Sequence, residues 1–193
     1  MRVIAGEAKG RRLLSVPGSG TRPITDRVKE SLFAILGSAV EGATFLDLFA
    51  GTGAVGIEAL SRGAAHATFV ERAPKAIEVI WKNLRATGLQ DRATVMEEDV
   101  FRFLHRNKDT YDIVYIAPPQ YRGLWERTLR ALEAAPHTVG WVAIVQIHPR
   151  EFRDLPLRTL SLAQVRRYGS TQLCFYTPLQ PQASEGPGHS DSC

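Results

Sequence analysis

The 193-residue sequence lacks long apolar runs, paired cysteines and clusters of metal-ligating residues. No apolar stretch approaches the roughly 18 residues that a membrane-spanning helix needs, so we expect no membrane partner. Its two cysteines, Cys174 and Cys193, give neither a disulfide framework nor the spacing of a metal site. The basic N-terminus, broken by glycine, is not typical of a signal peptide. We therefore expect a cytoplasmic protein without a bound metal.

Positive charge is concentrated near the N-terminus. The net charge is +4, and residues 1–30 hold seven basic against three acidic residues, which accounts for the whole excess. A basic segment on an otherwise neutral chain favours a polyanionic partner such as nucleic acid. A solvated arm without a partner fits the charge alone equally well. The oligomeric state stays open, with a monomer favoured.

From residue 43 onward, β-type and α-type segments alternate. Strands are predicted at 44–49, 67–71, 93–96, 112–116 and 141–147, with helices between them at 54–62, 74–87, just after Asp99 and at 124–134. Apolar strands separated by amphipathic helices imply a parallel sheet that is covered on both faces. Two further β-rich runs, at 157–165 and 172–177, have no helix between them and can close the sheet as an antiparallel pair.

The two ends of the chain differ from this α/β unit. Segments 2–5 and 11–15 are expected to pair as a hairpin, and a helix then begins after Thr25 and ends at Gly37. We assign residues 1–40 to a basic hairpin-and-helix appendage and residues 41–177 to the α/β domain. Residues 178–193 have almost no apolar content, which predicts a disordered tail.

Residues 46–56, L-D-L-F-A-G-T-G-A-V-G, predict a cofactor site. Their glycines permit a sharp turn, and the free N–H groups of the following helix favour an adenosine-bearing cofactor. The G-x-G-x-x-G spacing, with Glu71 20 residues beyond Gly51, also fits a nicotinamide dinucleotide. An NAD-dependent oxidoreductase is therefore one alternative.

Three features favour a methyl donor over a dinucleotide. Asp47 places a carboxylate at the strand end, which suits a positively charged cofactor such as S-adenosylmethionine. Asp99, after the third strand, can accept a hydrogen bond from an adenine. Pro118 and Pro119 end the fourth strand at the edge of the same crevice. The plainer alternatives are that Asp47 braces the loop and that Asp99 is an ordinary helix N-cap.

Several stretches closely resemble the RsmD-type ribosomal RNA methyltransferases. They are R-P-I-T-D-R-V-K-E (22–30), L-D-L-F-A-G-T-G-A-V-G-I-E-A-L-S-R-G-A (46–64), F-V-E (69–71), Y-D-I-V-Y-I-A-P-P (111–119) and R-Y-G-S-T-Q-L (167–173). The resemblance covers residues 1 to about 177. It implies a Rossmann-like methyltransferase fold with a mostly parallel, seven-stranded sheet and helices on both faces. It also implies S-adenosylmethionine-dependent methylation of a guanine N2 in 16S ribosomal RNA, on free RNA or on the assembling small subunit.

The resemblance implies roles for individual residues. Asp47, Gly51 and Gly53 would contact the methionine part of the cofactor, Glu71 its ribose and Asp99 its adenine edge. The rest of the predicted cofactor site is formed by their neighbours Phe49, Thr52, Arg72 and Val100. RNA contacts are expected from the basic residues of the appendage, Lys9, Arg11, Arg12, Arg22 and Arg27.

The end of the fourth strand departs from the family pattern. The family has an acidic residue, two prolines and an aromatic residue, whereas residues 117–121 read Ala117-Pro118-Pro119-Gln120-Tyr121. Methyl transfer needs in-line placement of the reacting atoms and acceptors for the amino hydrogens. The Pro118 carbonyl can be one acceptor, and Gln120 or Gln146 the other. Tyr121 can stack on an extruded base or simply cover the core.

We therefore predict that residues 117–121 are the catalytic segment of an RNA methyltransferase. The missing carboxylate keeps a second function open, a catalytically impaired RNA-binding or assembly factor that retains the cofactor site.

Overall fold

The structure of the chain, a computed structural model, describes residues 1–17 and 24–179. Arg22 and residues 180–193 of the predicted tail lie outside this range. The strands are Thr44–Leu48 (β1), His66–Glu71 (β2), Ala93–Glu97 (β3), Tyr111–Ile116 (β4), Val139–Ile147 (β5), Leu160–Tyr168 (β6) and Thr171–Pro178 (β7). The α-helices are Asp26–Leu36 (α1), Ala54–Ser61 (α2), Pro74–Thr87 (α3), Val100–Arg106 (α4) and Leu124–Ala134 (α5). Short 3-10 turns are Gly37–Val40 (η1), Gln90–Arg92 (η2), Pro136–Thr138 (η3) and Pro149–Glu151 (η4).

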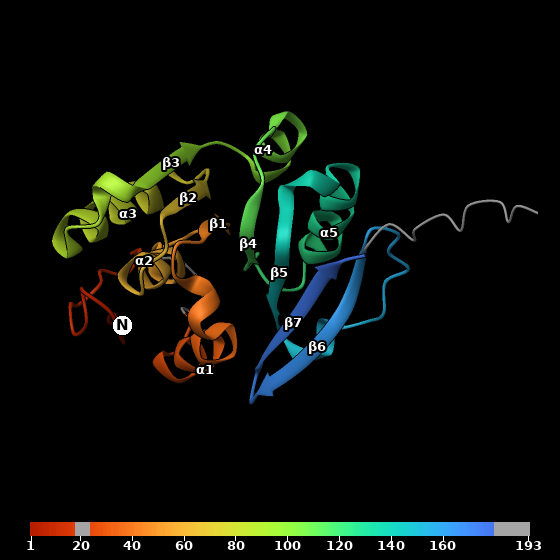
Figure 1. Cartoon of the computed structure of the whole chain (residues 1–193), viewed down its shortest axis with the longest axis horizontal. Coiled ribbons are helices and arrows are strands. Elements are labelled where there is room, and N and C mark those ends of the chain that lie inside the picture. The colour runs from red at the N-terminus through yellow and green to blue at the C-terminus, as the bar shows by residue number, and fades with distance from the viewer. Residues whose placement is uncertain (18–23, 180–193) are drawn as a thin grey trace, which may run out of the picture.

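One seven-stranded sheet, in the order β3-β2-β1-β4-β5-β7-β6, forms the middle layer of the molecule (Figure 1). The strands β1 to β5 are parallel, and β7 runs antiparallel to both β5 and β6. The predicted mostly parallel sheet and its antiparallel closing pair are thus confirmed. Among the described residues, none of the helices combines the length and apolar character of a membrane span.

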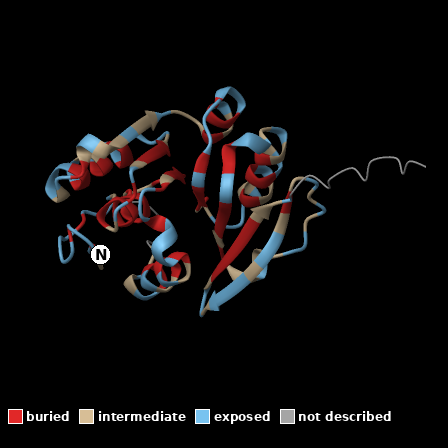
Figure 2. Ribbon diagram, viewed as in Figure 1, coloured by how far each residue is buried: buried red, intermediate tan, exposed pale blue. Residues whose placement is uncertain are grey.

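Helices cover both faces of the sheet, as predicted. One apolar cluster lies under α1, α2 and α3, and a second lies under α4 and α5. Figure 2 shows the buried residues concentrated in the central strands and in α2, while β6 is mostly exposed at the edge of the sheet. Because β6 lies at the edge of the sheet, its exposed positions can carry polar residues.

The start of β6 differs from the prediction. The strand begins at Leu160 rather than at Leu157. Glu133 of α5 accepts hydrogen bonds from the N–H groups of Arg158 and Thr159, the latter at 3.0 Å. These backbone donors are therefore bound to a helix side chain and cannot join the ladder with β7.

The N-terminal segment folds back on itself and packs on the α/β unit. Val3 N–H donates to Arg11 C=O at 3.0 Å, and Gly10 N–H donates to Val3 C=O at 2.9 Å. The two predicted hairpin segments thus pair, although only Arg2 and Arg12 form a β-bridge. The side chain of Val3 is buried in the same cluster as α1 and α2.

A buried ion pair joins this segment to two helices. Lys29 of α1 and Glu58 of α2 have no solvent exposure, and Nζ lies 3.2 Å from Oε2. Glu58 also accepts hydrogen bonds from the N–H groups of Ile4 (2.9 Å) and Ala5 (3.1 Å). One carboxylate therefore neutralises a buried ammonium group and satisfies two backbone donors of the N-terminal segment.

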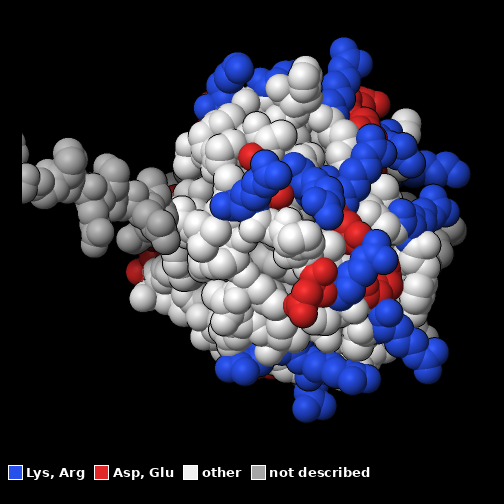
Figure 3. All heavy atoms as spheres, turned by 90° about the vertical axis from the view of Figure 1, so that its right-hand side faces the viewer, with Lys and Arg blue, Asp and Glu red and all other residues white. Residues whose placement is uncertain are grey.

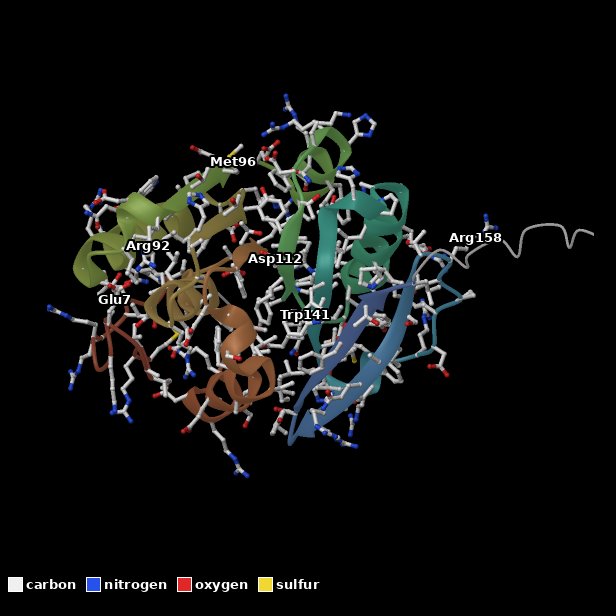
Figure 4. The ribbon with its side chains drawn as sticks, in the orientation of Figure 1. Glu7, Arg92, Met96, Asp112, Trp141 and Arg158 are labelled. Carbon is white, nitrogen blue, oxygen red and sulfur yellow. The ribbon has the colours of Figure 1, made fainter. Side chains whose placement is uncertain are left out.

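The tip of the hairpin also contacts α2 and η2. Gly6 has a φ of +80°, and a Cβ at this position would lie 1.7 Å from the carbonyl oxygen of Ser61, so only glycine permits this approach to α2. Glu7 forms an ion pair with Arg92 of η2, and both side chains are labelled in Figure 4.

Candidate functional site

The loops predicted to hold the cofactor and the target base meet at one edge of the sheet. The carboxyl ends of parallel strands form the edge at which open α/β sheets bind ligands. Asp47 of β1 is the register partner of Tyr115 of β4, and Ala117 N–H points to Leu48 C=O at 3.4 Å. The loop after β1 and the Pro-Pro loop after β4 are therefore neighbours, as predicted.

The glycine loop turns through the left-handed region of backbone space. Phe49, Gly51 and Gly53 have φ values of 61°, 56° and 74°. Gly56, inside α2, lies so close to β2 that a Cβ would come within 2.4 Å of the Phe69 ring. The glycines thus permit the tight turn and the close packing of helix on strand that the sequence predicted.

The Asp47 carboxylate lies beneath this loop. Its side chain is only 2% exposed, and Oδ2 accepts the Gly56 N–H at 3.1 Å. Burial raises the pKa of Asp47 to about 8, the hydrogen bond from Gly56 lowers it, and the negative charge of Glu71 raises it further. Of the two roles that the sequence left open, bracing of the loop is the one this hydrogen bond shows. Contact with the cofactor stays a prediction.

Glu71, at the end of β2, is bound to the glycine loop and to the loop after β2. Its Oε2 accepts the Gly51 N–H at 2.9 Å. Its Oε1 accepts the N–H groups of Arg72 (2.9 Å) and Ala73 (3.0 Å). The carboxylate is therefore fixed beside the first glycine, the place at which the sequence predicts the ribose.

Asp99 is the N-cap of α4. Its Oδ1 accepts the Phe101 N–H at 2.9 Å, and its Oδ2 lies 3.8 Å from the exposed guanidinium of Arg72. The side chain of Val100 is buried in the core beneath α4, so a ligand would meet its backbone. Its contact with the cofactor stays a prediction.

Sequence reasoning missed an aromatic group next to Asp99. The Phe101 ring meets the Phe49 ring edge-on, with 6.4 Å between centroids. The Arg127 guanidinium lies over the Phe101 ring, 3.7 Å from its centroid. The available signal was an aromatic residue in the first turn of the helix that Asp99 caps.

Tyr121 closes the Pro-Pro loop. Its φ is 58°, its N–H donates to Glu151 Oε1 at 2.6 Å, and its ring lies 5.6 Å from the His148 ring between centroids. The side chain is 63% exposed, so the alternative that Tyr121 covers the core is wrong. Gln120 is exposed, Pro118 is buried, and Ala117 and Pro119 are half-buried.

Glu151 is a second residue that the sequence did not reveal. Besides Tyr121 it binds the His148 N–H, at 3.3 Å, while His148 Nδ1 accepts the Arg150 N–H at 3.1 Å. These bonds form a capping box around η4 and join it to the Pro-Pro loop. Glu151 lies 30 residues beyond Tyr121, so no local spacing could have predicted the contact.

Gln146, one of the predicted acceptors, already has a donor. The Tyr115 hydroxyl donates to its side-chain oxygen. Burial, and to a lesser degree the charge of Asp47, raises the pKa of Tyr115 well above its usual value, which keeps the hydroxyl protonated. One lone pair of the Gln146 oxygen is therefore engaged within the protein.

The basic appendage reaches the cofactor loop through Asn83 of α3. This buried amide accepts the Leu14 N–H at 2.7 Å and donates to Leu14 C=O at 3.2 Å. It also donates to Thr52 C=O in the glycine loop, at 2.9 Å. Within residues 1–17 and 24–179, four of the predicted RNA-binding residues are exposed and form no ion pair: Lys9, Arg11, Arg12 and Arg27.

The sheet order and the loops at its carboxyl edge define a Rossmann-like methyltransferase fold. The structure matches one described as "Putative methyltransferase yhhF from Escherichia coli", with a TM-score of 0.82 and 34% identity over 92% of this chain and 97% of that one. A putative methyltransferase solved in complex with SAH shares the fold alone, with a TM-score of 0.63 and 18% identity over 78% of this chain and 48% of that one.

The sequence itself identifies the family. The family model "Conserved hypothetical protein 95" matches residues 1–177. "Putative rRNA methyltransferase YlbH" of Bacillus subtilis is 39% identical over 181 residues, which cover 91% of this chain and 98% of that protein. "Ribosomal RNA small subunit methyltransferase D" of Escherichia coli K12 is 41% identical over 143 residues, covering 74% and 70%. The chain belongs to this family, which confirms the resemblance to the RsmD-type enzymes and the prediction of an RNA methyltransferase.

Proposed function

We propose that the protein transfers the methyl group of S-adenosylmethionine to the exocyclic N2 of a guanine in 16S ribosomal RNA. The observation that carries this proposal is the meeting of the glycine loop and the Pro-Pro loop at one sheet edge, in a member of this family. The choice of guanine N2 rests on the resemblance. An enzyme of ribosomal RNA acts where ribosomes are assembled, so the cytoplasm is the proposed compartment.

The residues at the edge suit the parts of the cofactor. Glu71 would accept hydrogen bonds from ribose hydroxyls, and Asp99 and the backbone of Val100 would meet the adenine edge. The Phe101 ring offers an apolar surface beside them. A cation bound above the glycine loop favours the ionised form of Asp47, because an opposite charge lowers a carboxyl pKa. S-adenosylmethionine supplies the electrophilic methyl group when bound.

The Pro-Pro loop would present the target nitrogen. The Pro118 carbonyl is the proposed acceptor of one amino hydrogen, and the exposed Tyr121 ring is the surface on which an extruded guanine stacks. Glu151 holds the backbone of this loop through Tyr121. Because Ala117 carries no carboxylate, orientation by these groups has to supply most of the rate enhancement.

Methyl transfer to RNA is the direct test. The protein is incubated with labelled S-adenosylmethionine and small subunits, or their RNA, from cells that lack this mark, and the product is located by mass spectrometry. We expect one methylated guanine. Ala117→Asp, which restores the acidic residue of the family, should raise the single-turnover rate at least 10-fold. Ala39→Asp, an exposed substitution elsewhere, is the matched control and should not change it.

The second candidate function is an RNA-binding or assembly factor without catalysis, motivated by Ala117. It predicts binding of S-adenosylhomocysteine and RNA with no transfer to any RNA, and that result would refute the enzymatic proposal. Calorimetry with S-adenosylhomocysteine and with NAD separates both from an oxidoreductase, for which NAD alone would bind.

A further inference from the structure

A second basic surface lies on the face of the molecule that carries α5. We propose that this surface, formed by Arg127, Arg130, Arg153 and Arg158 and called here the α5 patch, binds phosphate groups of the substrate RNA. The inference rests on the proposed function, since it adds a contact to the same substrate. The residues predicted to bind RNA all lie in the N-terminal appendage, so the α5 patch is a separate surface.

An open cavity of about 590 Å³ lies at one end of the patch, between the end of α5 and residues 156–159. Arg130 and Arg158 both line it. Neither side chain forms an ion pair within the described parts of the chain. Planar guanidinium groups bind phosphate oxygens through paired N–H donors, so two free arginines at one cavity favour a phosphate ligand.

Two acidic residues of the patch, Glu133 and Glu126, are already engaged. Glu133, the acidic residue among those lining the cavity, accepts the N–H groups of Arg158 and Thr159. Glu126, one helical turn before Arg130, pairs with Arg153 at 2.5 Å. Their carboxylates are therefore bound to groups of the protein, and Arg130 and Arg158 stay available for an anion.

The patch extends from the cavity toward the site edge. Arg127 lies one turn before Arg130 on α5, a rise of about 4.5 Å, and contacts Phe101 next to the predicted adenine position. Figure 3 shows Lys and Arg side chains spread over this face, with fewer acidic ones between them. In Figure 4, Glu7 of the hairpin and Arg158 lie at opposite ends of the molecule. An RNA bound at the site edge would therefore have a basic surface on each side.

The salt dependence of RNA binding tests the proposal. The variant Arg130→Gln/Arg158→Gln is compared with Lys75→Gln/Arg85→Gln, which removes two exposed cations from α3 that form no ion pair within the described residues. Affinity for a 16S ribosomal RNA fragment is measured at several salt concentrations. Each lost phosphate contact reduces the slope of log K against log salt by about 0.7–0.9. We expect the magnitude of this slope to fall by about 1–2 for the arginine variant and to stay unchanged for the control.

Three results would overturn the proposal. The first is a slope of log K against log salt for the arginine variant that equals that of the parent protein. The second is a decrease in slope that is equally large for the α3 control. The third is weaker binding of the arginine variant to assembled subunits with unchanged binding to naked RNA. The last result would point to an acidic protein partner instead. S-adenosylhomocysteine binding, measured for every variant, shows that the fold is retained. If the parent protein itself transfers no methyl group, the proposed function fails. If the parent protein methylates RNA and the arginine variant binds RNA with an unchanged salt dependence, only the role of the α5 patch is refuted.

Discussion

The buried ion pair between Lys29 and Glu58 gives the sharpest test of how the N-terminal segment is held. Lys29 Nζ lies 3.2 Å from Glu58 Oε2 and donates to Arg2 C=O at 2.5 Å, and neither charged side chain is exposed. Lys29→Met keeps most of the apolar stem of the side chain and removes the terminal ammonium group with its charge and its donors.

The expected loss follows from what Glu58 retains. Removing one partner of a buried ion pair costs about 3–5 kcal/mol, because the other charge stays buried without that partner. Glu58 keeps the Arg62 Nε at 2.8 Å and the N–H groups of Ile4 and Ala5, so the lower figure of about 3 kcal/mol applies. One kcal/mol shifts Tm by about 2–4 °C in a chain of this size, which predicts a fall of about 6–12 °C.

Thermal unfolding followed by circular dichroism measures this fall. The control is Arg2→Gln, which removes an exposed ion pair to Asp26 at 3.4 Å, worth at most about 1 kcal/mol, and should lower Tm by less than about 4 °C. Lys29→Met/Glu58→Gln should recover part of the loss, since the amide still accepts backbone N–H groups and leaves no buried anion. A fall for Lys29→Met no larger than that of the control would refute this account of the ion pair.

Three further predictions concern the site and its support. Asn83→Leu removes one hydrogen bond to the glycine loop and two to Leu14, and should weaken S-adenosylhomocysteine binding at least 5-fold by calorimetry. Asn107→Leu, a buried amide that makes no contact with this loop, should lower Tm without this loss. Gly6→Ala should lower the free energy of unfolding in urea by at least about 2 kcal/mol, because the new methyl group meets the Ser61 carbonyl, and a smaller change would contradict the packing. Because the pKa of Asp47 is raised to about 8, the folded protein holds a proton that the unfolded chain has lost, so the free energy of unfolding falls as the pH rises from about 4 to about 8. Asp47→Asn should flatten that pH profile, and an unchanged slope would contradict the buried carboxyl.

The elements that the sequence predicted well have local signals. Thr25 caps α1 through its side chain, Pro74 lies in the first turn of α3, and Gly88 ends it in the left-handed conformation. The bounds of α5 also agree with the prediction. Each signal lies within a few residues of the boundary it sets, so no tertiary contact is needed to interpret it.

The features that the sequence did not reveal depend on residues distant in the chain. Lys29 and Glu58 occupy helix positions at which charges usually face solvent, and only packing shows that both are buried. The start of β6 depends on Glu133 of a preceding helix. Similarly, the glycine loop and Glu71 were evident from spacing, whereas Asn83 and Glu151 contact the site loops across 31 and 30 residues.

The backbone of the two site loops bears on whether the chain is an enzyme. Within residues 1–17 and 24–179, Phe49 and Tyr121 are the only non-glycine residues with a positive φ. Each lies in one of the two loops that meet at the sheet edge. Such residues cost of order 1 kcal/mol and persist where the surrounding structure holds them, typically at functional sites. Here Glu71 and Asn83 hold the loop of Phe49, and Glu151 holds that of Tyr121. An RNA-binding factor needs a basic surface but has no use for two strained loops fixed in advance, whereas in-line methyl transfer requires that both reactants be positioned before they meet. The strain therefore favours catalysis, in spite of Ala117.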